Sequence, residues 1–222
     1  IVSEKLNIPI YLYEEARRKE HYKLLSDIRK GEYEGLPEKL KDPNWQPDYG
    51  KPEFNPKLGA TVTGARPFLI AYNINLKTTD ISISNEISET IRESGKILRD
   101  ENGQPIRDEF GKTKRIPGKF KAVQAMGVFL DKYNITQVSI NLKDFNITGM
   151  HTVFEEVKKM ANEKNIETFG SEIVGLVPLK AMLDTADFYS NGKNLTEQEK
   201  IQLVIDKLGL STLNEFIPNQ KI

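Results

Sequence analysis

Between residues 67 and 178, strand-like and helix-like segments follow one another in an order that constrains the fold more than any other feature of the chain. The segments are strands at 67–76, 120–130, 135–145 and within 166–178, and helices at 82–100 and 150–165. The strands are rich in β-branched and aromatic residues, whereas the helices carry apolar residues three or four positions apart. The order βαββαβ predicts an α+β fold, a two-layer α/β sandwich of the ferredoxin-like type, with both helices on one face of an antiparallel sheet.

Extra helices are expected after this unit, at 179–189, 196–209 and 212–217. Thr196 and Glu199 have the spacing of a capping box, which predicts the start of the second of these helices. The polar stretch 101–118 interrupts the unit after its first helix and predicts a loose hairpin.

Residues 1–58 have the pattern of an incomplete unit. Residues 1–7 resemble the last turns of a helix, 8–13 a strand, and about 15–30 a helix. Since a domain seldom begins in mid-helix, we interpret the chain as a piece of a longer protein. The expected organisation is the end of an N-terminal α/β subdomain at 1–58, followed by a C-terminal subdomain at 59–222.

A proline-rich segment, KDPNWQPDYGKPEFNPKLG (41–59), joins the two expected parts. Its prolines prevent a long helix and predict an extended, rigid connector. A plain interdomain linker is one interpretation. Trp45, Tyr49 and Phe54 favour another, in which the segment packs on the protein or lines a site, because a solvated linker rarely exposes three aromatic rings. The small residues of 59–66 are interpreted as a close turn into the second subdomain.

Side chains with amide or hydroxyl groups recur along the predicted strands, where alternate residues share a face. They are Asn73, Asn75, Gln124, Gln137, Ser139 and Asn141. One interpretation is the ordinary solvent face of an antiparallel sheet. The other is a binding face, because amides outnumber the Lys, Glu and Thr usual on open faces. Amides donate and accept hydrogen bonds, which suits a heterocycle or a peptide-like ligand better than a metal or a phosphate.

Composition argues against several functional classes. Lys+Arg and Asp+Glu both number 32, so bulk attraction to nucleic acid or to an anionic membrane is not expected. Cysteine is absent, which excludes a thiolate nucleophile or Cys-ligated zinc and is compatible with a cytoplasmic location. No apolar run approaches the roughly 18 residues of a membrane span. GATVTGA is not a nucleotide loop, because it precedes a strand instead of opening a helix.

The chain has two histidines, His21 and His151. His151 follows Gly149 at an expected helix start, where the helix dipole favours a neutral imidazole that donates or accepts a hydrogen bond. A surface or capping histidine is the alternative. His21 lies in a charged stretch and is expected to be a solvated helix residue. Arg66 and Lys180 are candidate anion contacts, with a structural ion pair or a solvated side chain as the alternatives.

Several segments, in order along the chain, resemble the glutamate formiminotransferase family. They are YLYEEA, GEYEGLPEKL, GATVTGARPFLIAYNINL, VQAMG, QVSINLKDF, HTVFEEV and GSEIVGLVPLKAM. The resemblance implies folate-dependent transfer of a formimino group from N-formimino-L-glutamate to N5 of tetrahydrofolate, in histidine degradation. It also implies tetrahydrofolate as co-substrate, no metal, a homodimer, and a fused or separate cyclodeaminase.

The resemblance places a folate-binding segment on the connector. Its residues are Gly50, Lys51, Pro52, Glu53, Phe54, Asn55, Pro56, Lys57, Leu58 and Gly59. Gly50, Phe54, Pro56 and Gly59 fit the family pattern closely, whereas the two lysines, Glu53 and Leu58 vary. We expect the rigid backbone to offer amides to the pterin, Phe54 to meet its flat face, and a lysine to meet a glutamate carboxylate of the folate tail.

One part of the family pattern is missing from the chain. The family's catalytic histidine lies in a motif resembling GEHPRMGA, which does not occur here, and neither histidine takes its place. We therefore expect no catalytic residue in this chain. The alternatives are a formyl-group transferase or 5-formyltetrahydrofolate-handling protein on the same fold, and a non-catalytic folate-binding or dimerising module.

Overall fold

A computed structural model describes all 222 residues. The chain forms two compact units, Ile1–Pro67 and Phe68–Ile222, and each unit has its own hydrophobic core.

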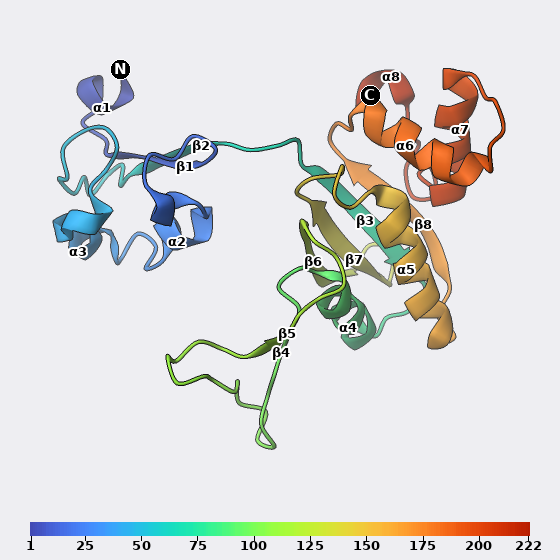
Figure 1. Cartoon of the computed structure of the whole chain (residues 1–222), viewed down its shortest axis with the longest axis horizontal. Helices are drawn as coiled ribbons and strands as arrows, with labels where there is room; N and C mark the ends of the chain where they lie inside the picture. Colours follow the sequence, from blue (N-terminus) through green and yellow to red (C-terminus); the bar gives the residue numbers. More distant parts are fainter. The chain divides into compact units, whose positions relative to one another are not determined.

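The second unit is built on a four-stranded antiparallel sheet (Figure 1). Its strands are β3 (Ile70–Leu76), β6 (Val123–Leu130), β7 (Ile135–Leu142) and β8 (Thr168–Val174). The order across the sheet is β6-β7-β3-β8, so the first and third strands of the βαββαβ series are central. This arrangement confirms the predicted ferredoxin-like sandwich.

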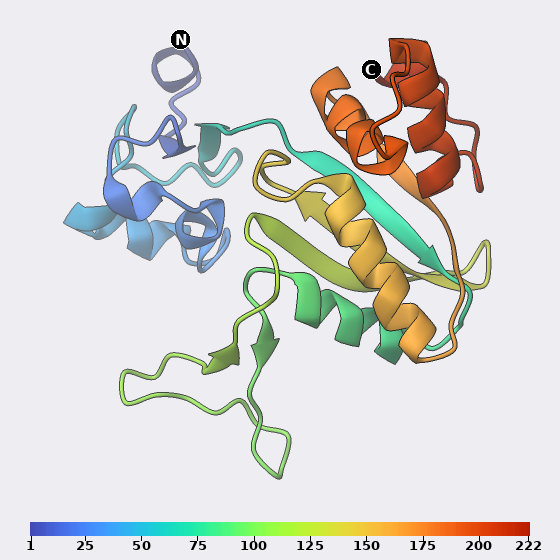
Figure 2. The ribbon, with the colours of Figure 1, turned by 45° about the vertical axis from the view of Figure 1, so that its right-hand side comes forward.

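Two helices, α4 (Ile81–Ile91) and α5 (Met150–Glu163), cover one face of this sheet (Figure 2). Alternation along β3 turns Tyr72 and Ile74 toward these helices, and both side chains are fully buried. The Tyr72 hydroxyl donates a hydrogen bond to Ser171 Oγ of β8 at 2.9 Å. Because this hydroxyl has a partner, the buried tyrosine costs little in unmet hydrogen bonding.

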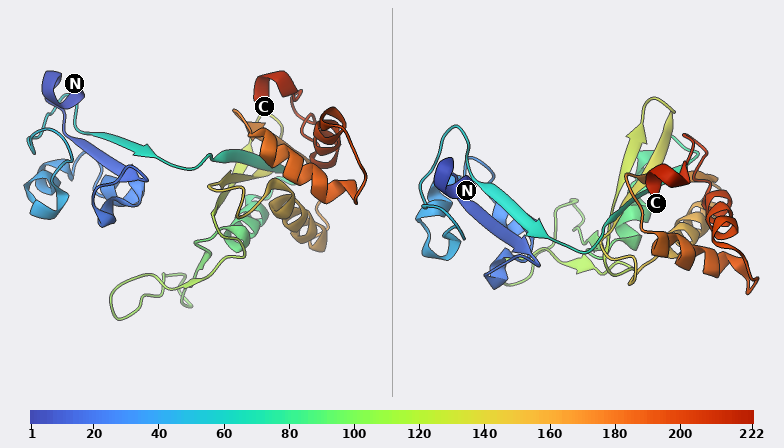
Figure 3. Two further views of the ribbon diagram at one scale, coloured as in Figure 1. Left: turned by 45° about the horizontal axis from the view of Figure 1, so that its top comes forward. Right: turned by 90° about the horizontal axis from the view of Figure 1, so that it is seen from above.

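Three further helices follow β8, and the first two of them pack against each other on one side of the second unit (Figure 3). They are α6 (Leu179–Ser190), α7 (Glu197–Leu208) and α8 (Pro218–Lys221). The capping box of Thr196 and Glu199 is present at the start of α7. The prediction of a helix at 212–217 is wrong, because this stretch is irregular. The N–H of Phe216 donates a hydrogen bond to Ser211 Oγ at 3.1 Å.

The helix predicted at 82–100 is too long. The Asp80 side chain caps its start by accepting the N–H of Ser82 at 2.9 Å, and the helix ends at Ile91. Arg92 ends the helical path because its ψ of 143° is extended, and Gly95 then has a left-handed φ of 65°. An arm follows in place of a loose hairpin, closed at its base by β4 (Lys96–Ile97) and β5 (Arg115–Ile116).

The arm contains two turns of the same construction, RDENG and RDEFG (Figure 2). In each turn the aspartate Oδ1, of Asp100 or Asp108, accepts two backbone N–H groups. In each turn the arginine before it, Arg99 or Arg107, donates to the glycine carbonyl at 2.8 Å. The arm is therefore an ordered pair of repeated turns.

The first unit contains a parallel pair of strands, β1 (Ile10–Glu14) and β2 (Thr61–Ala65). Short helices surround the pair: α1 (Val2–Lys5), η1 (Glu20–Tyr22), α2 (Leu25–Arg29), α3 (Leu36–Lys41) and η2 (Pro43–Trp45). The single helix predicted over 15–30 is wrong, because Leu24 has an extended ψ of 132° that separates η1 from α2. Because the chain changes direction at this break, Tyr22 and Ile28 are both buried in the hydrophobic core of the first unit.

The turn predicted at 59–66 is also wrong, because most of this stretch is β2. Its residues Thr61 and Val62 are β-branched and pair with Ile10 and Tyr11 of β1. As a result β2 belongs to the first unit, and the boundary between the compact units falls at Pro67, after the boundary expected at residue 58.

Candidate functional site

The segment 50–59, predicted to bind folate, lies at the surface of the first unit and ends in a turn. Asn55 Oδ1 accepts the N–H groups of Lys57 and Leu58 at 3.0 and 3.1 Å. The N–H of Gly59 donates to the Asn55 carbonyl at 2.7 Å, and Gly59 has a φ of 62°. The connector is therefore not extended along its whole length, because the Asn55 side chain closes its last part into a turn.

Tyr33 holds this segment from the side. Its hydroxyl donates to the Pro56 carbonyl at 2.6 Å, and its ring centroid lies 5.4 Å from that of Phe54. Phe54 is half-buried against the core of the first unit. Sequence reasoning did not single out Tyr33, although it lies in the segment GEYEGLPEKL that resembles the family.

The other two connector aromatics differ in environment. Trp45 packs on the core and stacks on Tyr22, with centroids 5.6 Å apart and planes inclined by 27°. Tyr49 is exposed and lies beneath the Arg18 guanidinium, 4.4 Å from its ring centroid. The interpretation that the connector packs on the protein is confirmed for Trp45 and Phe54.

A cavity of about 240 Å³ opens beside the end of the segment. Leu58 and Gly59 line it, together with Tyr11, Ile28, Arg29, Glu32, Tyr33, Leu36, Lys39, Ala60 and Val62. Burial lowers the pKa of Lys39, whose Nζ donates to the Lys30 carbonyl at 2.7 Å. Burial, with a smaller effect from Asp48, raises the pKa of Tyr11 to about 12. The wall is mostly apolar and includes a few polar groups, as is common in small-molecule sites.

In the second unit, the predicted amide residues share the sheet face that the helices leave open. Register pairs Asn73 with Ser139, Asn75 with Gln137, and Gln124 with Asn141. These six side chains form the amide face, the name used below. The prediction that they lie on one face is confirmed by this register.

The amide face contains a hydrogen-bonded chain of side chains. Gln137 Nε2 donates to Asn75 Oδ1 at 2.6 Å and to Glu172 Oε2 at 2.7 Å. Asn214 Nδ2 donates to Glu172 Oε1 at 3.1 Å. Asn75 is fully buried and Gln137 is 3% exposed, so this part of the face differs from an ordinary solvent surface. The Asn75 Nδ2 donor has no partner.

Glu172 and Asn214 were missed by sequence reasoning. Glu172 lies on β8, opposite Asn73, where no amide pattern marked the strand. Asn214 lies in the irregular stretch that was expected to be helical. Neither residue carried a signal, because its role depends on a contact between distant segments.

The remaining candidate residues from the sequence lie in different parts of the structure. His21 is exposed, and its Nε2 lies 2.7 Å from the Asn44 carbonyl oxygen. It lies in η1 instead of the regular helix expected. Arg66 is exposed at the end of β2. His151 and Lys180 line one cavity in the second unit, which is taken up below.

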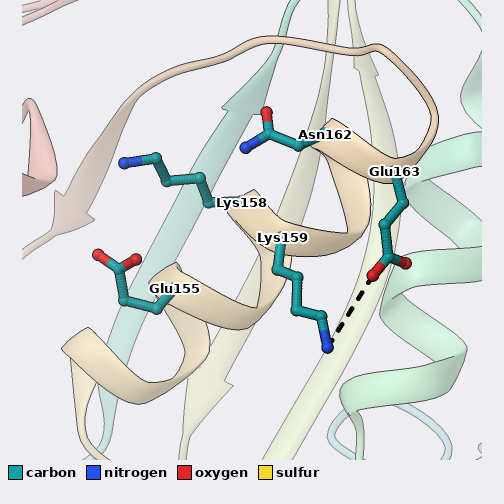
Figure 4. A pocket seen from close by; sticks show the side chains of 5 residues that line it. All are labelled: Glu155, Lys158, Lys159, Asn162 and Glu163. Atoms are coloured by element: carbon teal, nitrogen blue, oxygen red, sulfur yellow. Dashed lines mark ion pairs between the residues drawn. The ribbon is translucent and has the colours of Figure 1, made fainter.

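An open hollow of about 470 Å³ on α5 is a solvated helix surface (Figure 4). All five residues that line it belong to α5: Glu155, Lys158, Lys159, Asn162 and Glu163. Lys159 Nζ lies 3.9 Å from Glu163 Oε1, and both side chains are more than half exposed. Such a pair along one helix contributes little and indicates no ligand.

No three or more His, Asp or Glu side chains gather closely enough to hold a metal ion. No helix has both the length and the apolar character that a membrane span requires.

Comparison with known proteins gives matches over both units. A family model described as the formiminotransferase domain matches residues 71–222, and one described as its N-terminal subdomain matches residues 1–66. Formimidoyltransferase-cyclodeaminases of Mus musculus and Gallus gallus are 46% and 47% identical to the chain over its whole length. A glutamate formimidoyltransferase of Streptococcus pyogenes serotype M1 is 36% identical over 85% of the chain and 56% of its own length.

The chain spans 38% of the length of the two formimidoyltransferase-cyclodeaminases. The match nevertheless includes the β1–β2 unit and almost all of the ferredoxin-like unit, in the same order. The chain therefore belongs to the formiminotransferase domain family.

Proposed function

We propose that the protein containing this chain transfers a formimino group from N-formimino-L-glutamate to N5 of tetrahydrofolate, a step of histidine degradation. The family match over both units carries this proposal. The glutamate formimidoyltransferase name of the streptococcal relative, which aligns with 85% of the chain, supports it. The cyclodeaminase named in the animal relatives is a proposed partner activity, and a homodimer is the proposed assembly.

The segment 50–59 is proposed to contact the folate. Its Asn55-centred turn presents a defined backbone, and the N–H groups of Glu53 and Phe54 make no hydrogen bond within the protein. Lys51 and Lys57 are exposed and suit the carboxylates of a folate tail. Phe54 is held by Tyr33, so the pterin would meet a ring that is already oriented.

The amide face of the second unit is proposed as a separate surface that binds a polar ligand. Its amides offer donors and acceptors on a flat surface, which suits the ring edges of a pterin or the amidine of the formimino donor. The unpartnered Nδ2 of buried Asn75 supports a role in holding a polar group. No residue of this chain is proposed as the general acid or base, which the reaction needs to move protons during amine attack.

The folate segment is tested by calorimetric titration of folinate into the chain and into the double variant Phe54→Ala, Gly59→Val. The variant removes the oriented ring and places a branched side chain at a φ of 62°. We expect affinity to fall by about tenfold or more, the loss expected when an anchoring aromatic ring is removed.

Phe110→Ala is the matched control for this titration. Phe110 is 85% exposed at a turn of the arm, so its loss is expected to leave folinate affinity unchanged. Equal affinity of the double variant and the unaltered chain would remove the segment 50–59 from the site. Binding without formimino transfer, in the whole protein that contains this chain, would instead favour the folate-binding module.

The amide face is tested with Gln137→Leu. This change leaves Asn75 Oδ1 and Glu172 Oε2 without their donor, and we expect about 1–3 kcal/mol of lost stability and weaker folinate binding. Gln198→Leu is the control, because Gln198 is exposed on α7, lies outside the amide face and makes no side-chain hydrogen bond. Denaturant unfolding and calorimetry measure the two effects. Unchanged folinate affinity in a folded Gln137→Leu variant would show that folinate does not bind at this face.

A further inference from the structure

A second cavity, of about 270 Å³, lies within the second unit. It forms where the loop between β7 and α5 meets the first turns of α6. The lining residues that matter here are Phe145, Gly149, His151, Thr152, Lys180 and Asp184. None of them belongs to segment 50–59 or to the amide face, so the proposed function leaves this cavity without a role.

The cavity wall carries one positive and one negative side chain. Lys180 Nζ lies 2.6 Å from Asp184 Oδ2, and the two side chains are 63% and 43% exposed. An ion pair this exposed stabilises the protein by at most about 1 kcal/mol. A ligand that carries one negative and one positive group therefore replaces the pair at little cost.

Two helix starts add partial positive charge at the same place. Gly149 precedes α5 and Pro178 precedes α6, and neither gives a side-chain cap to the first turn. The uncapped N–H groups at such starts favour a carboxylate, especially beside a lysine. This end of the cavity is thus the one suited to a ligand's negative group.

His151 supplies a third polar group in the wall. Its ring stacks on Phe188, with centroids 4.6 Å apart, and its buried Nδ1 has no hydrogen-bond partner. Burial lowers the pKa of His151, although Asp184 and Glu155 oppose the shift. The imidazole is therefore neutral at pH 7, with one nitrogen able to donate and the other able to accept a hydrogen bond.

The charges of the wall select among ligand classes. A simple anion would meet the Asp184 carboxylate, and a simple cation would meet the Lys180 ammonium. A zwitterion satisfies both, and the cavity is smaller than the roughly 300–1,000 Å³ of sites for drug-sized molecules. We propose that this cavity binds a free α-amino acid, with the carboxylate at Lys180 and the helix starts and the ammonium group at Asp184. His151 lies beside the ligand and completes its hydrogen bonding.

The test uses the fact that the chain has only two histidines. In ¹H–¹³C NMR spectra of the chain with labelled histidine, His151 reports on the cavity and His21, in the first unit, is the internal control. The probes are L-alanine, L-glutamate, propionate and ethylamine, at constant pH and ionic strength. We expect saturable shifts of the His151 signal with both amino acids and none of the His21 signal. Propionate lacks the ammonium group and ethylamine lacks the carboxylate. We expect the affinity of each to be lower than that of L-alanine by about tenfold or more.

Three variants refine the assignment. Lys180→Met and Asp184→Asn should each weaken L-alanine binding by about tenfold or more. Lys193→Met, an exposed lysine after α6, should leave it unchanged. Propionate or ethylamine binding as tightly as L-alanine would overturn the zwitterion site in favour of a simple ion site. The absence of any saturable His151 shift in the unaltered chain would overturn the proposal without reference to a variant, and neither result bears on folate binding.

Discussion

Truncation of Ile74 to alanine is expected to lower the free energy of unfolding of the second unit by about 2–5 kcal/mol. Ile74 lies in β3, between Val138 of β7 and Ser171 of β8, and its side chain is fully buried beneath the helices. The change removes apolar contacts from the centre of a closely packed core and leaves a cavity that the sheet cannot close.

The measurement is urea unfolding followed by two signals. Circular dichroism reports mainly on the second unit, which holds the long helices, whereas the single tryptophan, Trp45, reports on the first unit. Val174→Ala is the control, because Val174 is 57% exposed on the same sheet and its truncation is expected to cost less than about 0.5 kcal/mol. Equal dichroism midpoints for the two variants would contradict the proposed packing.

Replacement of Gly170 by alanine is expected to destabilise the second unit by about 3 kcal/mol, because two separate costs add. Gly170 has a φ of 79°, which alanine adopts only with strain. A Cβ atom there would also lie 2.6 Å from the Gly209 carbonyl oxygen and 2.2 Å from Thr212 Oγ1. Backbone at the end of α7 cannot move away without leaving β8, since the N–H of Ser171 donates to Gly209 at 3.1 Å.

Gly175→Ala separates these two costs. Gly175 has a similar φ of 82°, but no atom lies within 4 Å of the position a Cβ would take. Its replacement should therefore show the backbone strain alone, about 1 kcal/mol. Thermal or urea unfolding of the two variants gives the difference. A Gly170→Ala variant no less stable than Gly175→Ala would show that the end of α7 is not held against β8 as described.

The second unit was largely predictable because its elements are long and periodic. The strands around Ile74 and Val138 are apolar on one face, and the apolar spacing of α5 repeats over several turns. The first unit was not predictable in the same way. Its helices are short, so they are set by contacts of Tyr22 and Ile28 with the core, and such contacts leave no period in the sequence.

The candidate site was predictable only in part, for a related reason. Alternation along a strand is a local property, so the shared face of Asn73 and Asn75 followed from the sequence. The donors and acceptors that complete the site come from residues far away in the chain. Tyr33 lies 23 residues before Pro56, and Asn214 lies 42 residues after Glu172. A single sequence carries no record of such pairs.

The repeated turns of the arm have a consequence for how this family member can change in length. Each RDE-x-G turn satisfies its own hydrogen bonds through its own aspartate and arginine, and Ile106 joins them by accepting and donating backbone bonds on either side. A copy of such a turn can be gained or lost by duplication or deletion of its codons without leaving unmet groups behind. We therefore expect a change in the number of these turns to alter the length of the arm while the sheet of the second unit keeps its packing.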